Sequence, residues 1–257
     1  GALGQDGTIL SNILKKNKKL NVYRLVEKNK QIKSKKNTFK INLINLEEIE
    51  NIFSKKKPDY VIHMGSRNPS YKENNFNKFY LKNMISTKNL FYTTFNYNTH
   101  SKFLFCNSSQ IFKNKVGMVN EKSKYKIKSD YTRFRVECNK LMQKYKLKNN
   151  LNYTNIILFN HDSIYRNQKF LIPRIIKSLI MKKNNFLNLI LKENIKADFS
   201  HAEEICKGLI KILFSKNNEN NVILSSGKLT SVSEIISYII KKRKIKLILQ
   251  KSKNTNQ

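Results

Sequence analysis

The chain opens with GALGQDGTIL (residues 1–10), in which glycines stand at positions 1, 4 and 7. In a dinucleotide-binding turn, the first glycine permits a tight bend, the second lets the backbone approach a pyrophosphate, and the third lets a helix pack on a strand. Helix-compatible sequence, TILSNILKK (residues 8–16), follows at once. The stretch therefore predicts a phosphate-binding turn that opens a helix, with the candidate residues Gly1, Gly4, Gln5, Asp6 and Gly7.

Glu27 ends the predicted strand NVYRLVE (residues 21–27) and lies 20 residues after Gly7. An acidic side chain at this place can accept hydrogen bonds from a ribose diol and would repel a 2′-phosphate. We therefore expect NAD as the cofactor, with NADP as the alternative. A solvated charge at the strand end remains the other interpretation of Glu27. The strand that should precede the turn is expected to be missing from this sequence.

The composition limits the classes of protein that fit. With 257 residues, of which 39% are hydrophobic, the chain can bury a sizeable core. No window approaches about 18 uninterrupted apolar residues, so we expect no membrane insertion. The net charge of +34 would suit a nucleic-acid partner, but the lysines are spread through nearly every segment beside abundant asparagine. An AT-rich coding bias explains this pattern better, and we expect no nucleic-acid partner.

The cysteines and histidines lack the spacing of a metal site. Cys106, Cys138 and Cys206 are far apart and form no CxxC pair. They predict reduced thiols in a cytoplasmic protein, with no disulfide frame and no metal. Three histidines show no ligand spacing either and are interpreted as structural, namely His63, His100 and His201.

Short apolar runs alternate with helical faces along the first part of the chain. The predicted strands cover residues 21–27, 59–64, 102–108 and 154–160, and the predicted helices cover 46–53, 77–97 and 131–147. This alternation predicts an α/β fold, a doubly wound parallel sheet of the Rossmann type, over residues 1–158. The pattern then loosens into helices at 172–181, 201–214 and 232–240 and a strand at 221–226. Residues 159–257 are expected to form a smaller substrate-binding lobe, interleaved with the first domain and incomplete at its polar end.

Several motifs resemble one family, in its order and at its spacing. The opening GALGQDGTIL resembles the G-x-x-G-Q-D-G start of the GDP-mannose 4,6-dehydratases, members of the extended short-chain dehydrogenase/reductase superfamily. The resemblance continues through KPDYVIHMGS (57–66), NMISTKNLF (83–91), ILFNHDS (157–163), KADFSHAEEICKGL (196–209) and SSGKLTSVSEI (225–235). It implies a nicotinamide-dependent enzyme that oxidises a GDP-linked hexose at position 4, eliminates water across positions 5 and 6, and returns the hydride at position 6.

That family uses a hydroxyl, a carboxylate, a tyrosine and a lysine four residues after the tyrosine. Ser108 matches the hydroxyl, and Tyr131 matches the tyrosine that takes the 4-hydroxyl proton. Gln110 stands where the carboxylate should remove the position-5 proton, and an amide has no useful basicity. Arg135 replaces the lysine and keeps its positive charge, although a planar guanidinium cannot simply reproduce an ammonium. A dehydratase would therefore need another base, for which the candidates are Asp130 and Glu121.

The resemblance also implies contacts to cofactor and substrate. Gly65 and Ser66 match a loop beside the cofactor phosphates, and Asn160 and His161 match positions that line the substrate and cofactor. The expected cofactor set is completed by Asn42, Leu43, Tyr131 and Arg135, and the expected substrate set is Ser108, Asn160 and Arg174. Three assignments stay open: His161 as a structural histidine, Arg174 as a surface charge rather than a diphosphate ligand, and Asn83, a helix asparagine of the superfamily, as a structural tie. Ala197 stands where the family has an arginine that contacts phosphate.

Three functions remain open at this point. The first is 4,6-dehydration of a GDP-hexose with a substitute base. The second is reduction or epimerisation of a similar nucleotide sugar, which needs Ser108 and Tyr131 but no position-5 carboxylate. The third is a paralogue that binds cofactor or nucleotide sugar without turnover. In each case the partner is a nucleotide sugar, and the resemblance implies a homodimer or tetramer that pairs through the helices at 77–97 and 131–147.

Overall fold

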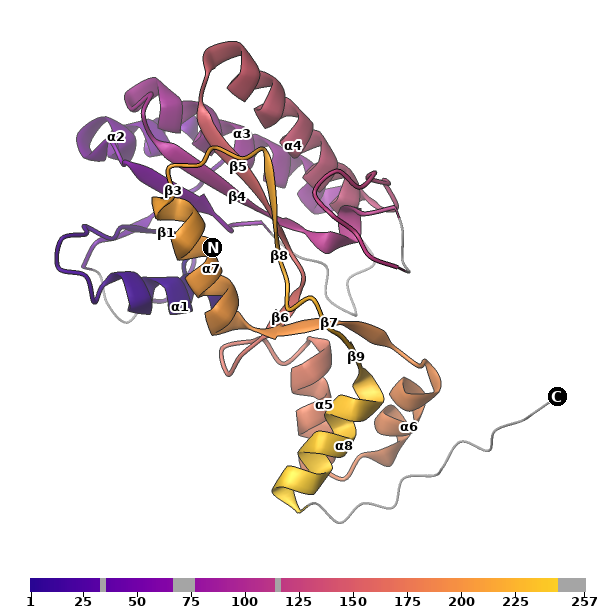
Figure 1. Ribbon diagram of the computed structural model, residues 1–257. Helices are drawn as coiled ribbons and strands as arrows, with labels where there is room; N and C mark the ends of the chain where they lie inside the picture. Colours follow the sequence, from indigo (N-terminus) through magenta and orange to yellow (C-terminus); the bar gives the residue numbers. More distant parts are fainter. Residues whose placement is uncertain (33–35, 67–76, 114–116, 245–257) are drawn as a thin grey trace.

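The computed structural model describes residues 1–32, 36–66, 77–113 and 117–244 and has an α/β Rossmann-like fold (Figure 1). Its main sheet contains four parallel strands in the order β3-β4-β5-β8. These strands span Tyr60–His63, Lys102–Ser108, Asn152–Leu158 and Asn221–Leu224. The fold class expected from the alternating pattern is confirmed.

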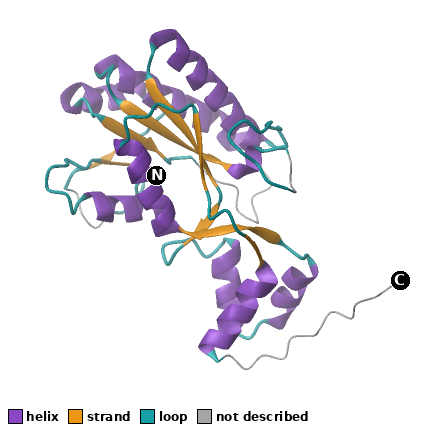
Figure 2. Ribbon diagram, in the orientation of Figure 1, coloured by secondary structure: helices purple, strands orange, loops and turns teal. Residues whose placement is uncertain are grey.

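Helices cover both faces of this sheet, as Figure 2 shows. The strand β4 explains why, because its side chains alternate between two apolar cores. Phe103 and Phe105 pack with α2 (Leu46–Lys56), α3 (Asn77–Tyr97) and α4 (Asp130–Asn149). Leu104 and Cys106 point the other way and pack with α1 (Gln5–Leu14) and α7 (Ala202–Phe214). A strand that is buried on both faces reads as a continuous apolar run, which is how the sequence predicted it.

Two short strands near the start form a separate parallel pair. They are β1 (Arg24–Val26) and β2 (Thr38–Lys40), with Val26 opposite Lys40. The strand expected over residues 21–27 is therefore shorter than predicted. Because both strands run in the same direction, the residues that follow them lie at one carboxyl edge of this sheet, where nucleotides bind in open α/β folds.

The second part of the chain builds a smaller body at one end of the molecule (Figure 1). Its sheet has the order β6-β7-β9, in which β6 and β7 are parallel while β7 and β9 are antiparallel. The strands span Asn160–Asp162, Lys196–His201 and Leu229–Ser231. An apolar core joins the helices α5 (Leu171–Ile180), α6 (Asn184–Lys192) and α8 (Val232–Arg243). We propose residue 158 as the boundary between the two lobes, with α7 and β8 returning to the first.

Most of the elements that the sequence did not predict are short. The strands β2, β6, β7 and β9 and the helix α6 have no counterpart in the predicted pattern. The strand expected over residues 154–160 is observed as β5, which begins at Asn152 and ends at Leu158. Asn160 then opens β6 in the other sheet. Strands of three residues are too short to show a period of two, so their existence depends on pairing between distant segments.

Candidate active site

The glycine-rich turn lies against the end of β3, and close packing explains two of its glycines. A Cβ on Gly1 would stand 2.6 Å from the backbone carbon and oxygen of Met64, and one on Gly7 would stand 2.3 Å from the oxygen of Gly1. Side chains cannot be accommodated at these distances without moving backbone. Gly65 closes the same contact, because a Cβ there would lie 2.9 Å from the nitrogen of Gly1. The predicted cofactor residues Gly1, Gly7 and Gly65 therefore meet in one turn.

Gly4 caps the N-terminus of α1 without any side-chain hydrogen bond to the first turn. The first backbone N–H groups of a helix have no partner inside the helix, and the helix dipole places partial positive charge there. Gln5 and Asp6 occupy this first turn. The turn has the donors and the open backbone that a pyrophosphate needs.

A cavity at the carboxyl end of the main sheet brings several predicted residues together. Ser108 ends β4 and Tyr131 opens α4, whose first turn is held by a capping box between Ser129 and Thr132. The lining also includes most of the other predicted catalytic and substrate residues, and the whole set is Asp6, Met64, Cys106, Asn107, Ser108, Ser109, Gln110, Tyr131, Arg135, Leu158, Phe159, Asn160, His161, Arg166 and Phe170. The Ser108 hydroxyl accepts the backbone N–H of Gln110 at 3.3 Å, which leaves its own hydrogen for donation.

The carboxylates suggested as substitutes for Gln110 do not line this cavity. Asp130 forms an ion pair with Arg133 at 3.5 Å on α4, and Glu121 accepts the backbone N–H of Ile223 at 3.0 Å. Asp6 is the carboxylate among the described lining residues, and it is paired with a histidine. The described part of the site therefore offers no carboxylate in the place of the missing base.

Arg135 is buried, with 4% of its surface exposed, and contacts three parts of the site. Its guanidinium donates to the carbonyl of Cys106 on β4 and to the hydroxyl of Ser66 at 2.5 Å. The guanidinium carbon also lies 5.1 Å from the centre of the Tyr131 ring. Arg135 thus joins the tyrosine, the end of β4 and the loop after β3, and it brings the predicted cofactor residue Ser66 next to the predicted catalytic pair.

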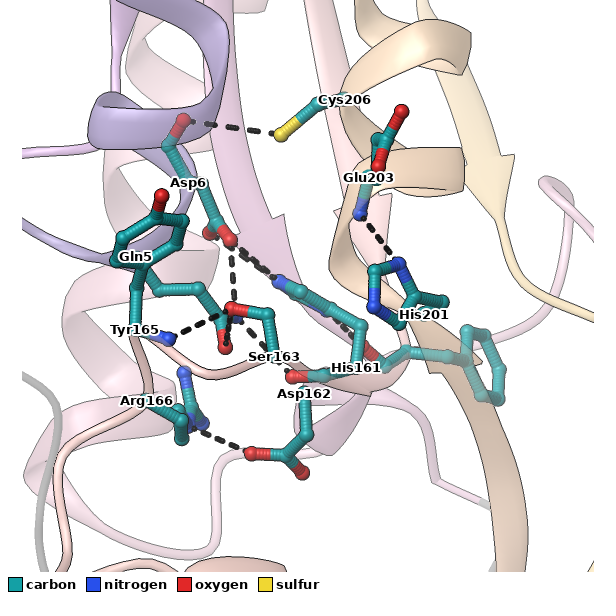
Figure 3. A network of polar contacts seen from close by, with 11 residues as sticks. Gln5, Asp6, His161, Asp162, Ser163, Tyr165, Arg166, His201, Glu203 and Cys206 are labelled. Carbon is teal, nitrogen blue, oxygen red and sulfur yellow. Dashed lines mark hydrogen bonds and ion pairs between the residues drawn. The ribbon is translucent and has the colours of Figure 1, made fainter. Parts of the chain in front are cut away.

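The two motifs QDG and FNHDS meet at the N-terminus of α1 (Figure 3). The His161 Nε2 lies 3.1 Å from both carboxylate oxygens of Asp6. Gln5 donates to the backbone oxygen of His161 at 3.2 Å and accepts from the hydroxyl of Ser163 at 3.1 Å. Segments more than 150 residues apart are therefore joined through Gln5 and Asp6 on one side and through His161 and Ser163 on the other. The alternative of a structural role for His161 gains support, since its ring is engaged by protein groups.

The predicted cofactor residues Glu27, Asn42 and Leu43 lie at the carboxyl edge of the β1-β2 pair. Glu27 follows β1 and is largely exposed, with Lys30 Nζ 3.9 Å from its carboxylate. Asn42 donates its backbone N–H to Glu48 at 3.0 Å, and the carbonyl of Leu43 accepts from Asn89 at 3.2 Å. None of the three lines the cavity described above. Their places suit a nucleoside that extends away from it, and their roles remain predictions.

The structure separates Arg174 from the cavity and brings Arg166 to it. Arg174 lies on α5 with its guanidinium carbon 4.2 Å from the centre of the Phe186 ring. Arg166, which the sequence did not single out, lines this cavity and a second one beside it. Its Nε lies 3.3 Å from Oδ1 of Asp162 in an ion pair, and its guanidinium carbon lies 3.7 Å from the centre of the Phe170 ring. Its place three residues after the FNHDS motif was the signal that could have found it.

The remaining candidates have structural surroundings. His63 is buried, hydrogen-bonds the hydroxyl of Thr87 at 2.9 Å, and has its pKa lowered by burial to about 3. His201 caps α7, and Asn83 is buried on α3. The cysteines are buried and unpaired: Cys106, Cys138 and Cys206. Within the described ranges, no group of three or more His, Cys, Asp or Glu side chains could hold a metal ion.

The sequence profile of the NAD dependent epimerase/dehydratase family matches residues 1–224, so the chain belongs to this family. No curated protein matches the sequence. The solved structures similar to it include a dTDP-glucose 4,6-dehydratase from Bacillus anthracis in complex with NAD, with 14% identity over 98% of this chain and 83% of that one and a TM-score of 0.78. No helix among the described residues has the length and hydrophobicity to span a bilayer.

Two further structures are similar at the same level. A UDP-glucuronic acid 4-epimerase from Bacillus cereus, in complex with UDP-glucuronic acid and NAD, has 16% identity over 97% of this chain and 83% of that one, with a TM-score of 0.82. RMD from Pseudomonas aeruginosa, complexed with NADPH, has 15% identity over 97% of this chain and 84% of that one, with a TM-score of 0.78. At these identities the likeness shows the fold, and the choice of substrate has to come from the site.

Proposed function

We propose that the chain catalyses nicotinamide-dependent oxidation and reduction at a sugar hydroxyl of a nucleotide hexose, and that the outcome is epimerisation or reduction. The observation that carries this proposal is the cavity at the end of β4. It joins Ser108 and Tyr131 with Asp6 of the glycine-rich turn, while the position of the eliminating base is held by Gln110. A hydride transfer needs the first pair of side chains, and an elimination needs the carboxylate that is replaced.

The turn fits a dinucleotide. Gly1 and Gly7 leave no room for a Cβ, and the first turn of α1 has no side-chain cap. When bound, the cofactor supplies a site that takes up and returns a hydride. We propose that the turn and the adjoining residues hold it, with NAD as the preferred form. The residues proposed for this role are Gly1, Gly4, Gln5, Gly7, Glu27, Asn42, Leu43, Gly65 and Ser66.

The protein's own side chains move the proton. The Tyr131 oxygen accepts the proton of the sugar hydroxyl, and Ser108 donates a hydrogen bond to the same sugar oxygen. The guanidinium carbon of Arg135 lies 5.1 Å from the centre of the Tyr131 ring. Its positive charge stabilises negative charge on the oxygens that exchange the proton. Arg135 also donates hydrogen bonds to the Cys106 carbonyl and the Ser66 hydroxyl. It therefore links the end of β4 and the loop after β3 to the helix that carries Tyr131.

The 4,6-dehydration of a GDP-hexose is the second candidate, and the interlocked motifs QDG and FNHDS favour it, since they carry the resemblance to that family. It requires a base for the position-5 proton other than the described carboxylates Asp130 and Glu121. The third candidate, binding without turnover, is favoured by the engagement of the Arg135 guanidinium with protein oxygens.

Product mass distinguishes the three candidates. The protein is incubated with NAD and, in separate reactions, GDP-mannose, UDP-glucose and dTDP-glucose. In a further reaction it is incubated with NADH and a nucleotide-linked 4-keto hexose. The products are analysed by mass spectrometry and by sugar chromatography. Epimerisation leaves the mass unchanged but shifts the sugar, and reduction of a 4-keto sugar adds two hydrogens. Loss of one water would instead support dehydration. Binding of a nucleotide sugar without any product would support the third candidate and overturn the first.

For the substrate we propose Asn160 and Arg166 as the polar contacts of the nucleotide diphosphate, in preference to Arg174. Arg166 lines both cavities, and the lining of the second cavity includes the apolar residues Leu171, Ile195 and Phe199. A cation at the junction of a polar and an apolar cavity suits a diphosphate that links a sugar to a base. Ala197 lines the second cavity without any phosphate-binding group.

We propose a cytoplasmic homodimer or tetramer that pairs through α3 and α4, with no nucleic-acid partner. Leu81 and Ile85, one turn apart on α3, are 65% and 41% exposed, which supports an interface on this helix. Buried, unpaired cysteines agree with a reducing compartment.

The cofactor preference is a testable prediction. Because Glu27 is exposed at the strand end and would repel a 2′-phosphate, NAD should bind more tightly than NADP. Lys28, next to it, is paired with Glu48 at 2.7 Å and so offers little attraction to the phosphate. Titration calorimetry with both cofactors measures the ratio of their dissociation constants. Glu27→Gln should reduce this ratio by roughly tenfold, which corresponds to about 1.4 kcal/mol. Tighter binding of NADP by the wild type would contradict the proposal.

A further inference from the structure

The two ring nitrogens of His161 both face hydrogen-bond acceptors. Nδ1 lies 2.6 Å from the backbone oxygen of Phe159, and Nε2 lies 3.1 Å from each carboxylate oxygen of Asp6. A neutral imidazole has one donor and one acceptor, so it can satisfy only one of these partners. Only the doubly protonated ring can donate to both. Because His161 lowers the pKa of Asp6 and so favours its ionised form, the hydrogen-bond pattern requires a positive charge on a histidine that is 8% exposed.

His201 provides a contrast in the same view (Figure 3). Its Nδ1 accepts the backbone N–H of Glu203 at 3.3 Å at the start of α7, so this nitrogen carries no hydrogen. One ring nitrogen of His201 therefore acts as an acceptor, whereas both ring nitrogens of His161 face acceptors.

The charge on His161 lies beside the glycine-rich turn, where an uncompensated negative charge would weaken the binding of phosphates. Asp6 lies in the first turn of α1, next to the N–H groups that would receive a pyrophosphate, and its carboxylate lines the cavity. An unpaired carboxylate there would repel the phosphates. Paired with an imidazolium, it contributes no net charge. The pairing also aligns the turn, since Gln5 holds the backbone of His161 and the side chain of Ser163 at the same time.

We propose that His161 is held as an imidazolium that positions the glycine-rich turn and neutralises Asp6, so that dinucleotide affinity falls on the alkaline side as this charge is lost. The proposal concerns regulation of the site and rests on the proposed function for its binding consequence. It assigns Asp6 and His161 as positioning residues, which act on the cofactor through the turn.

Charged and titratable groups on several elements surround the pair, and the contact with Asp6 decides the direction in which the pKa of His161 moves, against the opposing effects of burial and of Arg166. Burial alone would lower the pKa of His161, but the hydrogen bond and charge of Asp6 and the bond to Phe159 raise it above the ordinary 6.5. Burial would raise the pKa of Asp6, but the same contact with His161 outweighs it and lowers this pKa below 3.8. The other groups around the pair are Asp162 and Arg166 on the following segment, Cys206 on α7, Cys106 on β4, and Tyr131 and Arg135 on α4. A raised histidine pKa means that the stabilisation is complete below 6.5 and is lost as the pH rises through the raised value.

The charge of His161 is tested directly by nitrogen-15 NMR of the histidine rings in the full chain, without ligand. At neutral pH both ring nitrogens of His161 should resonate at imidazolium positions. Signals are assigned with His161→Gln and His201→Asn, and the asparagine keeps an N-cap for α7. A neutral His161 ring at neutral pH would overturn the proposal.

The binding consequence is tested by NAD titration over a pH series that rises from 6.5. The wild-type affinity should fall by roughly tenfold as the charge on His161 is lost, while the His161→Gln affinity should be low throughout and nearly flat. His201→Asn should follow the wild type. Equal pH dependence in wild type and His161→Gln would overturn the positioning role. Failure of NAD to bind at any pH would overturn the proposed function and with it the binding consequence, while the ring resonances would still decide the charge.

Discussion

Tyr131→Phe should slow hydride transfer from a nucleotide hexose by roughly 10²- to 10⁴-fold, because a positioned proton acceptor typically contributes that much to such a step. The phenol ring is 4% exposed and is packed beside the Arg135 guanidinium, and phenylalanine preserves that packing. The loss should therefore appear in kcat, with NAD binding retained. Formation of NADH on mixing with NAD and the nucleotide sugar, followed by absorbance, measures it.

Tyr145→Phe is the matched control for this prediction. Tyr145 lies on the same helix, α4, but is 41% exposed and packs against Tyr92 at 4.7 Å between ring centres. Removal of its hydroxyl should leave hydride transfer at the wild-type rate. If Tyr131→Phe also transferred hydride at the wild-type rate, another group would have to accept the hydroxyl proton, and the proposed role of the Ser108 and Tyr131 pair would be wrong.

The sequence predicted well those elements whose limits are set by the local pattern of apolar and polar residues. β4 is an uninterrupted apolar run bounded by polar residues, and its observed limits, Lys102–Ser108, agree with the prediction. α3 and α4 are long amphipathic segments with clear ends, and the glycine spacing at the start of the chain defines the turn. The catalytic candidates came instead from the resemblance of the motifs to one family, and Ser108 lies at the end of β4 while Tyr131 lies in the first turn of α4.

Contacts between distant segments could not be predicted in this way. Arg166 and Arg174 both follow FNHDS. Arg174 lies on α5 and packs on Phe186, whereas Arg166 lies before α5 and lines the cavity, and this difference depends on tertiary packing. The sequence likewise placed Asp6 and His161 separately among cofactor candidates, and their pairing depends on the approach of β6 to α1. The engagement of Arg135 by Cys106 and Ser66 is a tertiary contact of the same kind.

Gln110→Glu should create or raise dehydratase activity by roughly 10²- to 10⁴-fold, which is the contribution of a positioned general base. Gln110 lies in the short 3-10 turn Ser109–Ile111 directly after β4 and lines the same cavity as Ser108 and Tyr131. Its amide can hydrogen-bond a sugar but cannot take a proton from carbon. With GDP-mannose as substrate, loss of one water is followed by mass in wild type and variant side by side.

Two further variants make this test decisive. Gln168→Glu adds the same charge on an exposed residue near the cavity and should leave the product unchanged. Tyr131→Phe combined with Gln110→Glu should abolish water loss, because elimination follows oxidation of the 4-hydroxyl. If the wild type dehydrated as fast as Gln110→Glu, a substitute base would exist, and epimerisation or reduction would be wrong as the outcome. Since Asp130 and Glu121 lie outside the cavity, Asp6 would then be the carboxylate to replace first, by Asp6→Asn.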